Sequence, residues 1–450
     1  MSLPQSQTVS SSQPGAAARG FKTLVKSSSL IVGARVLGAL VGIATQIVLA
    51  RMLSAEALGL FFIAVSVAAV LSILCTLGYP MTVPRIVAQA AAAKEPGTLR
   101  AFMYRARIDS AAIALFLISG LVLIALSWPS ISSDMRICLV VAAVTTPVFA
   151  AIRLNGSLAN AHKRFAIGFL PDLFFRPLLL LAFILLAWSL WGAVSVAAIL
   201  IGHLLIAAGL AGWQIYRVSG LVPQQPPAGP TTGPYQHPDA RMWRRQAVPL
   251  VVAALFIGVF ADLDLVIAGA ILSEAETGIF GVCLKMSMFV AFGIQAVQQM
   301  ILRDAADALH HGDSAEVRAV IARGNILSLL GSIGATIGLV TFGRDILGYF
   351  GPAFEAGYYS LIILMIAQIV RAAAGPATQI LALTGHEKAS LPVFATGLVL
   401  LLLANLALVP WYGILGASIA VLLVTAVWSI WLALTVRRQL GINTLSLKAF

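Results

Sequence analysis

The chain has 450 residues, of which 60% are hydrophobic and only 10% are charged, whereas a soluble domain carries about 25% charged residues. A soluble globule of this size is excluded, because too few polar side chains remain to cover its surface. The composition predicts an all-α integral membrane protein. The net charge of +12 could indicate nucleic-acid binding, but lysine and arginine also gather in the cytoplasmic loops of membrane proteins, so no nucleic-acid partner is expected.

In chain order, residues 1–21 are rich in serine, glutamine, proline and alanine and predict a disordered cytoplasmic N-terminus. Twelve apolar runs follow, each long enough to cross the bilayer core as a helix. They are 27–49, 57–79, 108–128, 137–159, 165–187, 191–214, 246–270, 278–301, 320–342, 357–383, 390–410 and 413–436. We therefore expect two six-helix bundles, 22–214 and 246–438, around a central cavity. A flexible Pro/Gly linker, 215–245, joins them, and a cytoplasmic tail, 439–450, follows.

The positions of lysine and arginine predict the orientation. Most of the 29 basic residues fall in alternate loops and in the termini, with Arg153 counted among them, and only Arg51, Arg136 and Arg344 fall in the opposite loops. By the positive-inside rule both termini face the cytoplasm. The outer loops are short, so no catalytic domain is expected there, and the chain is not expected to be an enzyme. Its three cysteines lack metal-ligand spacing, and neither a metal nor a cofactor is expected.

The two halves of the sequence resemble each other. LSAEALGLF (53–61) aligns with LSEAETGIF (272–280), and 85–108 aligns with 303–326, with three arginines in matching positions. Because each half holds an even number of spans, the repeats run parallel. Parallel repeats of this kind form transporters with the substrate path between the halves, and one half rocks against the other to give alternating access.

Three stretches also carry a family resemblance: ARMLSAEALGLF (50–61), DLVIAGAILSEAETG (264–278) and PWYGILGASIAVLL (410–423). They resemble signatures of polysaccharide and O-antigen flippases of the multidrug/oligosaccharidyl-lipid/polysaccharide exporter superfamily. Two departures reduce the positive charge of the second half: Leu265 stands where a basic residue is frequent, and Ala270 stands where the first half has Arg51.

The resemblance implies a flippase that moves a lipid-linked oligosaccharide, usually on undecaprenyl diphosphate, from the inner to the outer leaflet of the cytoplasmic (inner) membrane. The product would be O-antigen, capsule or exopolysaccharide. The lipid-linked oligosaccharide and membrane lipids are the implied partners, and a polysaccharide polymerase or export machinery are candidate partners.

Arg35 and Arg371 lie inside spans without an acidic residue at helical spacing. A guanidinium at membrane depth must face water or an acid, and it can bind phosphate oxygens in pairs. Two interpretations stay open. The arginines bind the diphosphate of the lipid carrier, or they pair with Asp262 or Asp172 on another helix. Arg51, near the outer interface, is a weaker candidate for the same substrate site.

Asp264 and Lys285 lie at similar distances from the outer turn near Glu274, at a depth of about 15 Å. This spacing predicts an ion pair, which is either structural or part of a proton or cation relay. Asp262 lies about 200° around the helix from Asp264. One of the two aspartates is therefore expected to face the cavity and the other a helix interface, and either Asp262 or Asp264 is a candidate for coupling transport to a proton or cation gradient.

Asp172 and Arg176 in LPDLFFRP (170–177) are four residues apart and predict an intrahelical ion pair at a proline kink. The pair is either self-neutralised charge at the kink or a functional site. The small residues of GALVG (38–42) and GATIG (334–338) predict close approach between helices.

Three functions compete for this sequence: a polyprenyl-diphosphate oligosaccharide flippase, a multidrug cation/proton antiporter on the same fold, and a membrane enzyme such as a polymerase or glycosyltransferase. Four basic residues stand against three acidic ones within the spans, which favours an anionic substrate. The short outer loops and the parallel repeat argue against the enzyme. The sequence contains no phosphate-binding loop motif for ATP hydrolysis.

Overall fold

The computed structural model describes residue 33, residues 37–129, 131–222, 239–310 and 314–441, and residue 444. Within these ranges every regular element is a helix, as a chain in lipid requires, because a helix pairs its backbone groups internally. The predicted disordered segment 1–21 lies outside the described residues, as do 223–238 of the predicted linker and most of the predicted tail.

The first half begins with the helix Leu37–Met52. It continues with α2 (Ala55–Cys75), α3 (Tyr79–Ala93), α4 (Pro96–Ser127), α5 (Ser133–Ala161), α6 (Phe165–Leu170), a π-helical turn (Pro171–Phe175), α7 (Arg176–Trp191) and α8 (Val196–Ser219).

The second half follows the short helix α9 (Ala240–Ala247). It contains α10 (Leu250–Gly269), α11 (Glu274–His310), α12 (Ser314–Phe350), a 3-10 turn (Pro352–Gly357), α13 (Tyr358–Ala374), α14 (Ala377–Leu383), a 3-10 turn (Glu387–Ser390) and α15 (Leu391–Leu440).

Ten helical units in the described part of the chain are long and apolar enough to cross a membrane, so the chain is a multi-pass membrane protein. The last unit, Glu387–Leu440, holds both predicted spans 390–410 and 413–436, and Gly413 (φ 54°, ψ −133°) breaks the helix between them. Of the predicted span 27–49, the structure describes residue 33 and residues 37–49, and the helix Leu37–Met52 is shorter than the ten long units. The count of twelve spans therefore stays a prediction.

Serine residues begin the helices at one end of the bundle. The hydroxyls of Ser54, Ser132 and Ser195 accept hydrogen bonds from backbone N–H groups in the first turns of α2, α5 and α8. Ser273 begins α11 in a reciprocal arrangement with Glu276, because each side chain accepts from the backbone N–H of the other. Such caps satisfy N–H groups that a helix start leaves free. We call the end of the bundle at which these four helices begin the outer end, and we call the opposite end the inner end.

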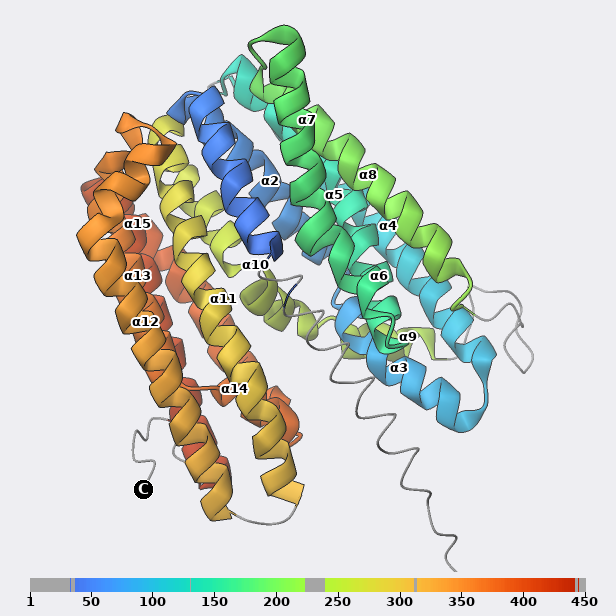
Figure 1. The fold of residues 1–450 in the computed structure, drawn as a ribbon. Coiled ribbons are helices and arrows are strands. Elements are labelled where there is room, and N and C mark those ends of the chain that lie inside the picture. The colour runs from blue at the N-terminus through green and yellow to red at the C-terminus, as the bar shows by residue number, and fades with distance from the viewer. Residues whose placement is uncertain are drawn as a thin grey trace, which may run out of the picture.

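The two halves meet at the outer end and diverge toward the inner end (Figure 1). Where they meet, α2 of the first half packs against α10 and α11 of the second, and all three helices contribute to one hydrophobic core. In that core Leu58 and Phe62 of α2 lie with Phe280 and Cys283 of α11.

Two glycines bring α2 and α11 into backbone contact. A Cβ on Gly59 would lie 1.9 Å from the carbonyl oxygen of Glu274, and a Cβ on Gly278 would lie 2.1 Å from that of Ala55. In the alignment of segment 53–61 with segment 272–280, Gly59 corresponds to Gly278 and Ala55 corresponds to Glu274. Each glycine therefore contacts the residue that corresponds to the contact partner of the other glycine. The sequence repeat thus becomes a symmetric contact between the halves, and only glycine fits at its centre.

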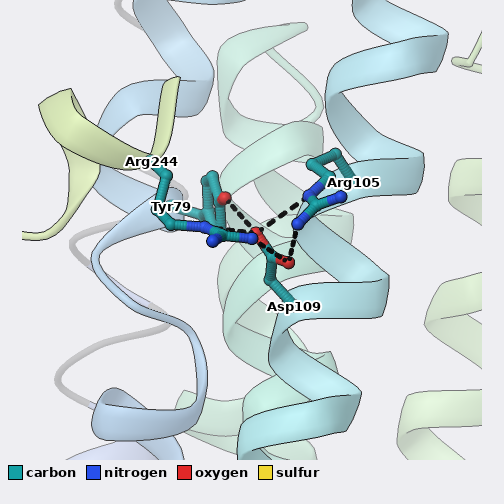
Figure 2. Close-up of polar contacts among 4 residues, drawn as sticks. All are labelled: Tyr79, Arg105, Asp109 and Arg244. Atoms are coloured by element: carbon teal, nitrogen blue, oxygen red, sulfur yellow. Dashed lines mark hydrogen bonds and ion pairs between the residues drawn. The ribbon is translucent and has the colours of Figure 1, made fainter. Parts of the chain in front are cut away.

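An ion cluster holds α9 against the first half near the inner end (Figure 2). Asp109 of α4 accepts from the Tyr79 hydroxyl at 2.6 Å and lies 2.8 Å from a guanidinium nitrogen of Arg105 and of Arg244. The hydrogen bond to Asp109 raises the pKa of Arg244, so the pair stays charged. Residues 240–247, which fall across the end of the predicted flexible linker 215–245, are therefore a helix fixed to the first half.

Replacing Asp109 with alanine should lower the free energy of unfolding by about 3 kcal/mol, because the two arginines lose a largely buried carboxylate. The measurement is the midpoint of thermal unfolding in detergent. Glu387→Gln, which removes an exposed acid, is the control and should change little. Equal midpoints for the two variants would contradict this role of Asp109.

Candidate functional site

A cavity of about 810 Å³ lies between the two halves. Helix Leu37–Met52, α2, α5 and the segment around Pro171–Phe175 line it from the first half, and α10 and α11 line it from the second. Its residues run from Asp262 at mid-depth to Asn160 and Gln295 near the inner end. Because the Gly59–Gly278 contact closes the outer end, the cavity faces the inner end. Its volume is in the range of sites that enclose whole small-molecule ligands.

Among the described residues, five charged side chains line the cavity, three basic and two acidic. Arg176 and Asp172 form the predicted ion pair at 2.8 Å, which confirms that expectation. Lys285 and Asp262 form a second pair at 3.2 Å. The fifth charge, the guanidinium of Arg153, has no carboxylate within 4 Å in the described part of the chain. The lining therefore has an excess of one positive charge.

Arg153 lies on α5 where the two halves face each other. Its Nε donates to the Ser72 hydroxyl at 2.9 Å, and a Cβ on Gly258 of α10 would lie 3.9 Å from its Nη1. The hydrogen bond fixes one edge of the guanidinium and leaves its other N–H groups available. A guanidinium with free donors in a partly dry cavity binds the paired oxygens of a phosphate well.

Arg153 is not among the site residues predicted from the sequence, because its position was assigned to a cytoplasmic loop. In the structure α5 continues to Ala161, so Arg153 stands eight residues, or about 12 Å, inside the helix end. The sequence does contain an indication of this site, because residue 153 lies within the predicted span 137–159. A basic residue inside a span is a candidate for a site, and one in a loop is not.

Asp262 joins the two halves at mid-depth. Its Oδ1 accepts from Lys285 Nζ of α11 at 3.2 Å and from the Ser66 hydroxyl of α2 at 3.0 Å. The predicted pair between Asp264 and Lys285 is therefore wrong. Counting residues from the outer turn gave similar depths but not the facing of each side chain. The helical rotation between the two aspartates turns Asp262 toward Lys285.

Asp264 lies away from the cavity, between α10 and α15. It is fully buried, and its Oδ1 accepts from Asn405 Nδ2 at 2.9 Å. Its Oδ2 has no hydrogen-bond partner in the described part of the chain. A buried carboxylate without a cationic partner is costly unless a proton or a cation neutralises it.

Of the three arginines proposed to bind phosphate, the structure describes Arg51 and Arg371, and neither of them lines the central cavity. Arg35 lies outside the described residues. Arg371 does not line the cavity. Its guanidinium carbon lies 5.9 Å from the centre of the Trp428 ring, inside the second half. Arg51 lies at the outer end and donates to the carbonyl oxygens of Tyr349 at 2.6 Å and Gly348 at 3.2 Å.

The alternative interpretation of Arg371 is wrong as well. Asp262 and Asp172 pair with Lys285 and Arg176, respectively, and not with Arg371. Among the described residues, no three histidine, cysteine, aspartate or glutamate side chains gather in a group that could hold a metal ion.

The sequence matches the model of one family, described as polysaccharide biosynthesis protein, over residues 24–299. The chain belongs to this family. The match confirms the predicted resemblance to the polysaccharide branch of the exporter superfamily. A relative from Haloferax volcanii, named "Probable flippase AglR", is 25% identical over 176 residues. That match covers 38% of this chain and 37% of the relative, so the chain spans little more than a third of its length.

Two solved structures show the fold that this polysaccharide biosynthesis protein adopts. One is an inward-facing multidrug resistance MATE family transporter of the MOP superfamily, with a TM-score of 0.72, 11% identity, and coverage of 90% of this chain and 94% of that one. The other is the lipid II flippase MurJ in an inward closed conformation, with a TM-score of 0.68, 12% identity, and coverage of 91% and 87%.

Proposed function

We propose that the chain is a flippase that moves a polyprenyl-diphosphate-linked oligosaccharide across the cytoplasmic membrane by alternating access, without a chemical reaction. The observation that carries this proposal is the guanidinium of Arg153, which faces a cavity between the two halves and has no carboxylate partner there. A diphosphate is the group in such a substrate that a free guanidinium recognises. The family match to polysaccharide biosynthesis proteins supports the glycan class.

The proposed topology has twelve spans in two six-helix bundles, with both termini and the inner end in the cytoplasm. The basic side chains at the inner end support it, because Arg105 and Arg244 lie in the cluster around Asp109 there. In this orientation the cavity opens toward the leaflet from which the substrate enters. A polysaccharide polymerase or export machinery would receive the product on the other side.

The proposed alternating access exchanges two contacts. The α2–α11 contact at Gly59 and Gly278 opens at the outer end, while the inner ends of α5 and α11 approach each other. The hydrogen bond between Ser66 and Asp262 joins the halves between these two ends and is a natural pivot for the motion. Such rigid-body rocking is expected of two parallel repeats.

A multidrug cation/proton antiporter is the second candidate, because the MATE family transporter has the same fold and two carboxylates line the cavity. Both carboxylates already have cationic partners, Arg176 and Lys285, so an organic cation would have to displace one of them. The remaining unpaired charge in the cavity is positive and favours an anion.

Proteoliposomes test the two candidates directly. The purified protein is reconstituted with a fluorescent polyprenyl-diphosphate oligosaccharide, and translocation is followed as protection of the glycan from a membrane-impermeant glycosidase. A parallel set of vesicles measures the uptake of an organic cation such as ethidium. Translocation of the glycolipid without cation uptake is expected. Cation uptake without glycolipid translocation would overturn the proposal.

Coupling to an ion gradient is proposed to use Asp264. This carboxylate is buried and lacks a partner for Oδ2, so a bound proton or cation would neutralise it. Asp264→Asn should make translocation insensitive to an imposed proton or sodium gradient while the Asn405 contact is kept. Glu387→Gln, which removes an exposed acid outside the cavity lining, is the control and should keep the gradient dependence. Unchanged gradient dependence in Asp264→Asn would remove Asp264 from the coupling step.

A further inference from the structure

A second, smaller pocket of about 40 Å³ lies inside the second half, apart from the central cavity. It is formed where α11, α13, α14 and α15 meet, and Figure 1 shows α14 beside α11 in the lower part of this half. The polar and aromatic side chains that line it are Gln298, Arg371, Thr378, Gln379, Trp428 and Ser429.

A break in the helix shapes this pocket. α13 ends at Ala374, and Gly375 (φ 72°) and Pro376 turn the chain before α14 begins at Ala377. A Cβ on Gly375 would lie 2.6 Å from Asn325 Oδ1, so the turn requires glycine both for its backbone angles and for its space. The turn places the side chains of α14 opposite the end of α13, which carries Arg371.

The pocket contains one cation and no acid among its lining residues. Arg371 has the Trp428 ring as its neighbour at 5.9 Å, and no carboxylate lies within 4 Å of it in the described ranges. Ser429 is 1% exposed, and its Oγ has no hydrogen-bond partner there. A buried hydroxyl without a partner and an uncompensated guanidinium in one pocket both indicate a missing anionic ligand.

We propose that this pocket binds a single phosphate group, either free phosphate or the phosphodiester of a phospholipid headgroup. The guanidinium offers paired donors to two phosphate oxygens, and the hydroxyls of Ser429 and Thr378 offer donors to others. The volume corresponds to about three to four water positions, which suits one phosphate group. The site is therefore distinct from the cavity proposed for transport.

The test uses the full-length protein with Arg153→Ala as the common background, so that phosphate bound in the central cavity does not contribute. In one arm, delipidated protein in a neutral detergent is titrated with radiolabelled inorganic phosphate by equilibrium dialysis. In the other arm, protein in phosphate-free buffer receives phosphatidylglycerol, and native mass spectrometry counts the retained lipid. The first arm reports free phosphate and the second a lipid headgroup.

Binding of one equivalent in at least one arm is expected. Arg371→Gln should weaken it tenfold or more, because a charge-assisted bond is lost, and Ser429→Ala should weaken it about threefold. Arg438→Gln, which removes an exposed arginine of α15, should leave it unchanged. Ser429→Ala keeps the charge and most of the packing, so it remains informative if Arg371→Gln folds poorly. No binding in either arm, or binding that Arg371→Gln and Ser429→Ala do not weaken, would overturn the proposal.

Discussion

Arg153→Ala should reduce translocation of a lipid-linked oligosaccharide by about tenfold to a hundredfold without lowering the amount of protein in the membrane. Hydrogen bonds to a charged group contribute about 1.5–3 kcal/mol, and the guanidinium of Arg153 is the charge without a carboxylate within 4 Å among the described lining residues. The loss concerns binding and not folding, because the variant removes a cation that has no carboxylate to leave behind. The measurement is the initial rate of glycan protection in proteoliposomes.

Two further variants separate charge from position at this site. Arg153→Lys keeps the cation but loses the paired donors, so it should recover only part of the rate. Arg217→Ala, at an exposed position near the end of α8, removes the same charge outside the cavity and should leave the rate unchanged. A wild-type rate for Arg153→Ala at normal protein levels would remove this residue from substrate binding.

Much of the architecture follows from hydrophobic run length, because a helix in lipid needs about 20 apolar residues wherever it lies. The ten described units correspond to predicted spans within a few residues at many of their ends, except where helices continue beyond the bilayer, as α4 does from Pro96. The Asp172–Arg176 pair was also predictable, because both partners lie on one helix at a fixed spacing.

The facing of side chains between helices was not predictable in the same way. Close helix approach was expected at both glycine motifs, 38–42 and 334–338. It is confirmed at Gly38, where a Cβ would lie 2.1 Å from the Leu173 carbonyl oxygen, and it is wrong at Gly42, Gly334 and Gly338, where a Cβ would meet nothing within 4 Å. A motif gives the spacing of small residues, but the packing of neighbouring helices decides which face they occupy.

The partner of Lys285 shows the same limit. Depth along the helix pointed to Asp264, while the rotation of α10 presents Asp262, and α10 also departs from helical backbone angles at Val259 (φ −144°, ψ 27°). Rotation and local distortion depend on contacts with α2 and α15, which no spacing within α10 encodes. The sequence could therefore name the charged residues but not the pairs that form between different helices.

Gly59→Ala should shift the protein away from the inward-facing state by about 2 kcal/mol, a change of about thirtyfold in the equilibrium between the two states. The added Cβ would lie 1.9 Å from the Glu274 carbonyl oxygen. The alanine side chain therefore keeps α2 and α11 too far apart for the outer end to close. The three native cysteines are buried, so a cysteine placed at Met288, in the cavity lining at mid-depth, reports the state through labelling by a membrane-impermeant maleimide. Labelling from the inner side should fall and labelling from the outer side should rise.

Gly331→Ala is the matched control, because a Cβ at Gly331 of α12 meets nothing within 4 Å. Alanine inside a helix is better than glycine by about 0.5–1 kcal/mol, so this variant should be slightly more stable and should keep the wild-type labelling. Gly278→Ala, the repeat partner of Gly59, should act in the same direction as Gly59→Ala, since its Cβ would meet the Ala55 carbonyl oxygen. General destabilisation would expose Met288→Cys from both sides, whereas an outer end that cannot close moves the accessible side from inner to outer. Unchanged inner labelling in both glycine variants would show that the α2–α11 contact does not hold the outer end closed.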